Sequence, residues 1–467
     1  MGRVHRVDHI EESGGGAKKM STYSYAAEVA AYEQANPRSA ARFAEAQQVL
    51  AGGNSRLTAY FKPFPFYVER AEGCELVDID GNRRLDFYNN ATSLILGHAN
   101  PQLTAALIAQ AERGTAYANP TEPEVALATL LTKQIPSLER VRFTNSGTEG
   151  VALAIQAARA FTGKAKIAKT EGGYHGTSDT VSISVATDLS RAGTADAPQP
   201  VPSSGGVTAR TLDDVVIIPF NDAEAARRII AEYREELAAV VVEPVMASIG
   251  YVQADTTFLE TLREVCDGQN VLLIYDEVQT FRMSPGGLQA TVGILPDMTC
   301  LGKIIGGGMA VGGFGGRADI MSVFDATEHA PVIPHGGTFN GNPMTMRAGL
   351  ATMQQLSQDV YERINEYGTT LRHQLDEMAR HYDVPLSVTG TASFFGLQCT
   401  DQPIRDYRSA QGQDKVLQQK LFLHFLNNGI YISNKNSGNI SAVIGREEMD
   451  QFIKVWEAFL VKINQSN

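Results

Sequence analysis

One lysine stands in a setting that suits covalent chemistry. Lys303 ends a short apolar run, Thr299–Gly302, and a glycine-rich turn at 304–308 follows at once. Partial burial disfavours the ammonium form and lowers the pKa of a lysine, which suits an amine that attacks a carbonyl group. The glycines let the backbone approach a bulky planar ligand. Because most lysines at strand ends reach solvent, this segment alone only makes Lys303 a candidate nucleophile.

An acidic pair follows a second apolar run. Val271–Tyr275 leads directly into Asp276 and Glu277. The run predicts a parallel strand buried on both faces, and ligands bind at the carboxyl ends of such strands. A pyridoxal phosphate (PLP) enzyme needs a carboxylate beside the pyridine nitrogen, so that the protonated ring withdraws electrons. Asp276 fits that role, although the pair could equally cap the next helix.

A third segment offers a phosphate site. A strand ending near Thr144 leads through the turn Ser146-Gly147-Thr148 into an alanine-rich helix. The start of a helix presents free N–H groups and a positive dipole end to an anion. The hydroxyl groups of Ser146 and Thr148 would add donors. An ordinary helix N-cap is the alternative function of this turn.

A glycine-rich turn at 172–176 carries an aromatic pair. Tyr174 could stack on a pyridine ring, and a plain surface turn is the alternative. The nine histidines show no metal-ligand spacing, so we expect no metal site, and His98 and His175 should pack or form hydrogen bonds.

Together these motifs resemble the class III (fold type I) PLP-dependent aminotransferases, in the branch of glutamate-1-semialdehyde aminomutase. The resemblance runs from about residue 37 to 460 and rests on matching motifs at 145–149, 173–176, 243–244, 276–278, 301–309 and 337–343. Within the branch, Gly53–Arg56 and Phe64–Phe66 are most similar to bacterial β-amino acid aminotransferases, such as the β-phenylalanine aminotransferases. The aminomutases usually carry a Val-Asn-Ser-Pro-Val-Arg pattern, which this chain lacks.

The resemblance implies roles around the cofactor ring. Lys303 would hold PLP as a Schiff base and move a proton between the substrate carbon and the cofactor. Asp276 would pair with the pyridine nitrogen, and Gln279 would bond the ring hydroxyl. Val278 and Tyr174 would pack on opposite ring faces.

The resemblance also implies how the rest of the cofactor is held. Glu243, which follows the apolar run Ala239–Val242, would orient the cofactor or a nearby water. His175 would be another cofactor-binding residue. Thr338 would reach the phosphate of a neighbouring subunit, so the active sites of a homodimer would be shared. Three residues of the helix start would bind the phosphate: Ser146, Gly147 and Thr148.

Arg56 is the candidate for binding the substrate carboxylate, because a planar guanidinium matches a carboxylate bidentately. A surface salt bridge is the alternative role. Related β-amino acid enzymes carry another arginine in the C-terminal domain, but here that stretch, 434–439, has none. Lys435 or Asn436 would be weaker substitutes, which makes binding of 2-oxoglutarate less secure than binding of the amino donor.

The predicted reaction is transamination of a β-amino acid, such as 3-aminobutanoate or β-phenylalanine, to a 3-oxo acid, with 2-oxoglutarate or pyruvate as acceptor. The alternative is an isomerase, a glutamate-1-semialdehyde-type 2,1-aminomutase. A non-catalytic ligand-binding relative would not be expected to retain Lys303 and Asp276. A nicotinamide dehydrogenase is disfavoured because the glycines at 306–316 show no GxGxxG at a strand–helix turn.

The order of elements predicts an α/β fold with a smaller α+β domain. The resemblance implies that this fold is of type I, with a mixed, mostly parallel sheet covered by helices. We expect a segment at 20–90 that joins the small domain, a large PLP-binding domain at 91–342 and a small domain at 343–467. Residues 1–19 lack the apolar core of a signal peptide and predict a non-native leader or a disordered tail. The segment 186–210, rich in Ser, Gly, Pro and Ala, predicts either a lid near the cofactor or disorder.

Composition agrees with a globular enzyme. The 467 residues are 43% hydrophobic and 20% charged, with a net charge of −12, which argues against a nucleic-acid-binding surface. Four scattered cysteines fit a reducing cytoplasm with mostly buried thiols. No run of 18 apolar residues predicts a membrane span. The resemblance implies that the partners are small amino and keto acids and a second copy of the chain.

Overall fold

The structure is a computed structural model that describes residues 23–465, so the predicted leader at 1–19 lies outside the described residues. Its centre is a seven-stranded sheet in which every strand runs parallel except β12, which is antiparallel to both neighbours. The predicted α/β fold with a mixed, mostly parallel sheet is confirmed. Across the sheet the order is β4 (Arg140–Thr144), β12 (Gly312–Gly316), β11 (Met298–Gly302), β10 (Leu272–Asp276), β7 (Leu237–Val242), β5 (Lys166–Thr170) and β6 (Val215–Ile218).

The apolar runs form strands because both faces of the sheet are covered. Every residue of β7 is buried, and its side chains alternate between two cores. Val240 and Val242 pack with α8 (Ala223–Glu232) and α9 (Thr256–Gln269), whereas Val241 packs with α6 (Gly147–Thr162). This period of two is the geometry of a strand between two helical layers.

The glycine-rich strand β12 lets two neighbouring backbones come unusually close. A Cβ atom at Gly312 would collide with the carbonyl oxygen of Ser146. Glycine at this position therefore allows the turn that starts α6 to lie directly against the sheet.

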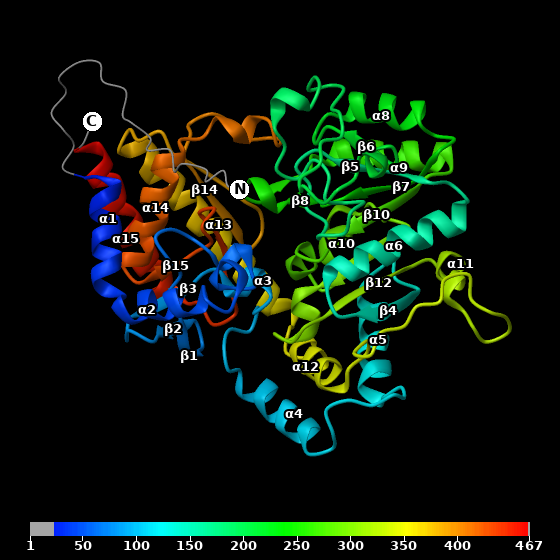
Figure 1. The fold of residues 1–467 in the computed structure, drawn as a ribbon, viewed down its shortest axis with the longest axis horizontal. Helices are drawn as coiled ribbons and strands as arrows, with labels where there is room; N and C mark the ends of the chain where they lie inside the picture. The colour runs from blue at the N-terminus through cyan, green and yellow to red at the C-terminus, as the bar shows by residue number, and fades with distance from the viewer. Residues whose placement is uncertain (1–22, 466–467) are drawn as a thin grey trace, which may run out of the picture.

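The two ends of the chain form a second part beside the sheet, where the blue and orange-red segments lie together (Figure 1). β2 (Glu75–Asp78) and β3 (Arg83–Asp86) form an antiparallel hairpin that is joined by the turn at 79–82. From the C-terminal region, β15 (Ile430–Tyr431) adds in parallel to β3. The other elements of this part are β1 (Val68–Glu72), β13 (Ser387–Thr389), β14 (Phe394–Gln398), β16 (Ser437–Asn439), α1 (Tyr25–Ala35), α2 (Pro37–Ala46), α13 (Gln358–His381), α14 (Lys415–Asn427) and α15 (Arg446–Asn464).

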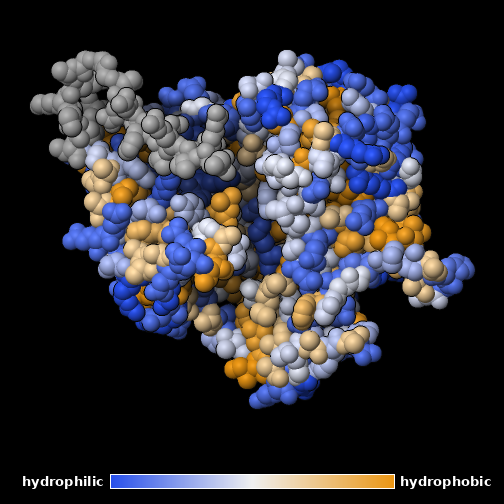
Figure 2. Space-filling model, in the orientation of Figure 1, coloured by the Kyte–Doolittle hydropathy of each residue, from blue (hydrophilic) through white to orange (hydrophobic). Residues whose placement is uncertain are grey.

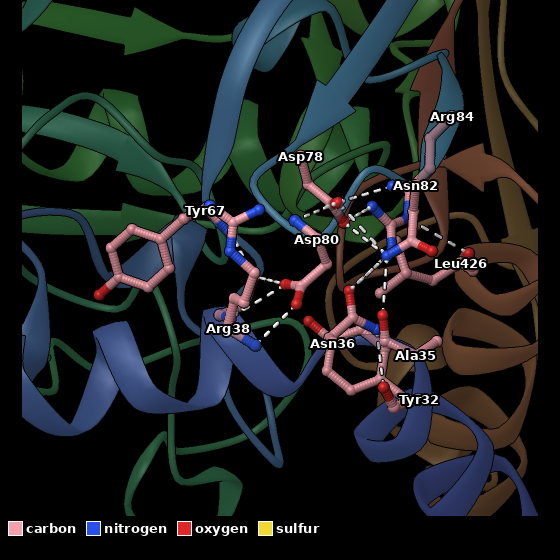
Figure 3. Close-up of polar contacts among 11 residues, drawn as sticks. Tyr32, Ala35, Asn36, Arg38, Tyr67, Asp78, Asp80, Asn82, Arg84 and Leu426 are labelled. Carbon is pink, nitrogen blue, oxygen red and sulfur yellow. Dashed lines mark hydrogen bonds and ion pairs between the residues drawn. The ribbon is translucent and has the colours of Figure 1, made fainter.

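A buried polar network fixes the hairpin against the first two helices (Figure 3). Arg84 pairs with Asp78, and both side chains are almost completely buried. Arg84 also donates to Asn36 Oδ1 over 3.0 Å, at the elbow between α1 and α2. Asp80 accepts from the backbone amides of Arg38 and Ser39, at 2.6 and 2.9 Å. Because these buried charges are paired and hydrogen-bonded, they specify one arrangement of the N-terminal segment.

The remaining helices and strands are α3 (Asn89–Thr92), α4 (Pro101–Ala111), α5 (Glu122–Gln134), α7 (Ala209–Leu212), β8 (Val245–Met246), β9 (Val252–Gln253), α10 (Gly287–Val292), α11 (Ala318–Met321) and α12 (Pro343–Met353). Within 186–210, Arg408 donates to the carbonyl oxygens of Ala192 and Gly193, and the Tyr407 hydroxyl accepts from the Thr187 amide. This loop thus packs on the C-terminal part of the chain, and its role as a lid stays a prediction.

Two further expectations bear on the setting of the protein. Cys266, Cys300 and Cys399 are buried and Cys74 is half-buried, and all four are free thiols, as expected for mostly buried cysteines. Among residues 23–465, no helix has the length and apolar character needed to cross a membrane.

Candidate active site

The predicted site residues converge at the carboxyl edge of the sheet. Asp276 ends β10, Lys303 follows β11, Glu243 follows β7 and His175 lies in the turn after β5. On the other side of β12, Ser146 leads from β4 into α6. The carboxyl ends of parallel strands meet at one edge, so residues far apart in the sequence face one space. The surface is hollowed between the two parts of the molecule (Figure 2).

The Asp276 carboxylate is buried, and each of its two oxygens contacts a nitrogen of the protein. Its Oδ2 atom lies 2.9 Å from Nδ1 of His175, and its Oδ1 atom accepts from the Val278 amide at 3.1 Å. Burial lowers the pKa of His175, although Asp276 opposes that shift. We therefore assign His175 as a neutral imidazole that donates from Nδ1, which orients Asp276 without cancelling its charge.

Lys303 has the properties that its predicted role requires. Burial lowers the pKa of its amine to about 8, and the positive charge of Arg56 acts in the same direction, whereas Asp276 and Glu243 oppose it. A substantial fraction of the amine is then neutral near pH 8 and available for attack on a carbonyl. The backbone of Lys303 is left-handed, with φ at 50°, a strained conformation for a non-glycine residue.

A buried acid–base pair lies behind the site. Glu243 is 4% exposed and accepts from the Tyr174 amide at 2.7 Å. Burial and, to a smaller extent, the charge of nearby Asp276 raise the pKa of Glu243 to about 8. Lys169 is completely buried in β5 and donates to the carbonyl oxygens of Thr170 and Ile183, at 3.1 and 2.8 Å.

Lys169 is a site residue that sequence reasoning missed. Burial lowers its pKa to about 7, while Glu243 and Glu171 oppose that shift. The available signal was a lysine inside the buried-strand pattern Lys166–Thr170, because a lysine is almost never fully buried without a partner.

The turn before α6 acts as a helix N-cap, one of the two functions that the sequence left open, and its role in binding a phosphate stays a prediction. The Ser146 hydroxyl caps the helix by accepting from the Glu149 amide at 3.2 Å. Gly147 and Gly302 both lie against the side chain of Val278. A Cβ atom added to Gly147 or to Gly302 would lie only 3.0 or 3.1 Å from a Val278 methyl group. The helix start, the strand end that carries Lys303 and the segment after Asp276 are therefore packed as one unit.

The loop that carries Thr338 is attached to this turn. Asn340 accepts from Asn145 at 2.9 Å and contacts His335, which accepts from Arg142 at 2.9 Å. Thr338 itself is exposed, and its contact with a neighbouring subunit stays a prediction. The other ring contacts expected from the sequence are also partly open: Tyr174 is 46% exposed and Gln279 is half-buried.

The two candidate cations for a carboxylate lie on the N- and C-terminal segments. Arg56 is exposed, donates to Asn90 Oδ1 at 2.6 Å and is near enough to Lys303 to influence its pKa. Lys435 is exposed to solvent and interacts electrostatically with Glu243. Asn436 does not suit the substitute role considered for it, because its buried amide donates to the Gln418 carbonyl at 3.0 Å.

These groups fit a phosphorylated pyridine aldehyde. A lysine amine with a lowered pKa can condense with the aldehyde, the braced Asp276 carboxylate can face a protonated ring nitrogen, and the start of α6 can bind the phosphate. His175 Nε2 is buried and has no hydrogen-bond partner among the described residues. An unpartnered buried nitrogen marks a place where a further polar group can bind.

Comparison with known proteins establishes the family. Residues 58–454 match the family model of the class-III aminotransferases, and the chain belongs to that family. Enzymes of this family use PLP, and the protein is a PLP-dependent enzyme. The resemblance inferred from the sequence motifs is thereby confirmed.

Individual relatives differ in the reaction they catalyse. The chain is 38% identical to a glutamate-1-semialdehyde 2,1-aminomutase of Methanocaldococcus jannaschii, over 84% of this chain and 89% of the relative. It is 43% identical to an omega-transaminase from Sphaerobacter thermophilus, with a TM-score of 0.88, covering 91% and 97% of the two chains. It is 34% identical to a β-phenylalanine aminotransferase from Variovorax paradoxus, with a TM-score of 0.86, covering 94% and 96%.

Proposed function

We propose that the protein moves an amino group on a substrate whose single carboxylate lies at least one methylene away from the reacting carbon. The position of Arg56 carries this proposal. Its guanidinium influences Lys303 electrostatically but belongs to the N-terminal segment, outside the strand ends that bear Lys303 and Asp276. An anion bound there would place its reacting carbon at Lys303 only if the two groups were separated along the substrate.

The residues would divide the work as follows. Bound PLP supplies an electron sink for the substrate carbon. Lys303 would hold the cofactor and transfer the proton at the reacting carbon, because its pKa of about 8 lets the amine accept and return a proton near neutrality. Asp276, oriented by His175, would keep a positive charge on the ring nitrogen. Arg56 would bind and orient the substrate carboxylate.

The remaining groups would position the cofactor. We assign the phosphate to the start of α6 and a ring contact to Val278, with Glu243, Tyr174 and Gln279 around the ring. Thr338 would complete the phosphate site of a second copy. We also propose a homodimer, in which the exposed apolar side chains of Ile108, Val125, Val332 and Phe339 are candidates for the contact surface. The division into domains at 91 and 343 and a cytoplasmic location remain proposals.

Two reactions fit this substrate geometry. The curated relatives support the 2,1-aminomutase reaction better than the β-amino acid transamination that the sequence motifs put first. In glutamate 1-semialdehyde, two methylenes separate the remaining carboxylate from the amine-bearing carbon, so the substrate meets the distance requirement.

A specific observation keeps β-amino acid transamination as the second candidate. An aromatic cluster lies beside Arg56: the rings of Tyr88 and Tyr431 are 5.7 Å apart, and those of Phe66 and Tyr431 are 5.1 Å apart. Arg56 interacts electrostatically with both tyrosines. An aromatic cluster would bind an aryl substituent of the substrate better than it would bind an unsubstituted aliphatic chain.

Dependence on an amino acceptor separates the two reactions. The purified enzyme, loaded with PLP or its amino form, would be incubated with glutamate 1-semialdehyde alone, and with β-phenylalanine with and without 2-oxoglutarate or pyruvate. Turnover of the semialdehyde without an acceptor would identify the aminomutase. Turnover of β-phenylalanine only with an acceptor would identify the transaminase.

Arg56→Ala tests the substrate geometry that both reactions share. Truncating one partner of a charge-assisted pair costs about 2–5 kcal/mol, so kcat/KM for the carboxylated substrate should fall by roughly 30-fold or more. A primary amine without a carboxylate serves as the control and should react as before. Equal losses for both would show that Arg56 is structural, and Lys435→Ala would then be tested.

A further inference from the structure

A strained turn lies beneath Arg56. Four consecutive residues without a glycine, Asn89 to Thr92, have φ values of 49°, 48°, 55° and 74°. L-residues visit this left-handed region as single residues, and each one costs on the order of 1–2 kcal/mol. A β-branched residue such as Thr92 is disfavoured there even more. Four in succession persist only where the surrounding structure imposes them.

The constraint comes from two buried side chains. Arg282, completely buried, donates to the carbonyl oxygens of Thr92 and Ile440 and to Oδ1 of Asn439. Asn439 in turn accepts from the Asn89 amide group and donates to the Tyr88 carbonyl, with both contacts at 3.1 Å or slightly longer. No carboxylate pairs with Arg282 among residues 23–465, and its Nη1 group joins the turn at Thr92 to Asn439.

Asp86 braces the turn from its other side. Its Oδ1 atom accepts from the backbone amides of Tyr88 and Asn89, each at 2.8 Å, and its Oδ2 atom lies 2.8 Å from His98 Nε2. The backbone is thus held at its entry by Asp86 and at its exit by Arg282. Asn89 and Thr92 point into the protein and are completely buried.

One polar side chain of the turn, that of Asn90, faces outward and contacts Arg56, the candidate substrate-binding residue. Asn90 is exposed, and its Oδ1 atom accepts from Arg56 at 2.6 Å. Its amide nitrogen donates to the Ser93 hydroxyl at 3.0 Å, and that hydroxyl donates to the Asn90 carbonyl at 3.0 Å. The side chain of Asn90 therefore has a fixed orientation, with its oxygen directed at the guanidinium.

We propose that Asn90 is a positioning residue that holds Arg56 at the mouth of the active site and, being uncharged, leaves its positive charge free for the carboxylate of the substrate. An aspartate would make the same contact but would neutralise the guanidinium and repel the incoming anion. An asparagine also tolerates the left-handed backbone, which few other polar residues do. This inference rests on the proposed role of Arg56 in binding the substrate.

The test compares two variants on the carboxylated substrate identified above and on an amine without a carboxylate. Asn90→Asp should raise KM for the carboxylated substrate about tenfold or more, the effect of opposing like charges at a binding site, with kcat little changed. Asn90→Gly suits the same backbone but frees Arg56, and should raise that KM by a smaller factor. Neither variant should affect the amine without a carboxylate.

A matched control uses another exposed asparagine in the left-handed conformation. Asn270 ends α9 with φ at 53°, and Asn270→Asp introduces the same charge away from the site, so KM should not change. A second measurement needs no turnover. Competitive acetylation of the cofactor-free protein reports the pKa of Lys303. That pKa should rise in Asn90→Asp, which adds a negative charge, and in Arg56→Ala, which removes a positive one.

The outcomes separate this inference from the proposed function. An unchanged KM in Arg56→Ala would overturn the carboxylate role of Arg56, and the inference with it. A raised KM in Arg56→Ala with an unchanged KM in Asn90→Asp would overturn only the role of Asn90. Equal losses for the carboxylated donor and the amine without a carboxylate in Asn90→Asp would mean that the turn is merely structural.

Discussion

Replacing Lys303 with methionine should make the cofactor-free protein more stable. The pKa of Lys303 is lowered from 10.5 to about 8, chiefly because the folded protein buries the ammonium group. The unfolded chain then binds more protons than the folded one between pH 8 and 10.5, so the lysine lowers stability below that window. Methionine has a similar length and carries no charge, so it removes this penalty.

The size of the gain follows from the shift. A change of one pKa unit corresponds to about 1.4 kcal/mol, so the full shift from 10.5 to about 8 would give about 3 kcal/mol at pH 7. Lys303 is only half-buried, and solvent screening reduces the penalty. We expect Lys303→Met to raise the free energy of unfolding by about 2 kcal/mol at pH 7.

Urea unfolding of both cofactor-free proteins between pH 7 and 10.5 measures this difference. The gain should be full at pH 7 and shrink as the pH rises through the window, because the wild-type lysine then loses its proton in both states. Lys454→Met, at an exposed position of α15, is the control and should change stability by less than about 0.5 kcal/mol. An equal or lower stability of Lys303→Met at pH 7, or a gain independent of pH, would refute the reasoning.

Three further predictions concern the same region. Borohydride reduction of the PLP-loaded enzyme, followed by peptide mapping, should find the pyridoxyl group on Lys303; a label on the buried Lys169 instead would reassign the catalytic lysine. Asp276→Asn should keep the fold, measured by circular dichroism, but lower kcat by about 100-fold or more, so near-wild-type turnover would contradict its role. Ala91→Gly should raise the free energy of unfolding by about 0.5–1 kcal/mol, because glycine relieves the left-handed strain at φ 55°; a loss of stability on urea unfolding would count against that strain.

The elements that carry the main site were predictable because each has a strong local signal. The apolar runs before Asp276 and Glu243 form β10 and β7, since strands covered on both faces need continuous apolar sequence. The start of helix α14 at Lys415 also has a local signal, because the Asp414 carboxylate accepts from the amides of Val416 and Leu417 and caps the helix there.

The conformation of the turn that contacts Arg56 could not be predicted in the same way. The left-handed turn Asn89–Thr92 is imposed by Arg282 and Asn439, which lie about 190 and 350 positions away along the chain. No local propensity encodes such a conformation, since Ala91 and Thr92 favour other backbone angles. The burial of Lys169 could not be predicted for a related reason. It depends on strands β6 and β7, which pair with β5 on either side.

Strain and buried charge are concentrated at the groups that would contact the substrate. Lys303 and the turn that holds Arg56 both have left-handed backbones without glycine. The pKa values of Lys303 and Glu243 are both moved to about 8, one downward and one upward. Near neutral pH both groups can exchange a proton with little free-energy cost, as general acid–base chemistry requires. A site selected only for stability would lose these features, so their joint retention around one space is the physical argument that this edge of the sheet performs the chemistry.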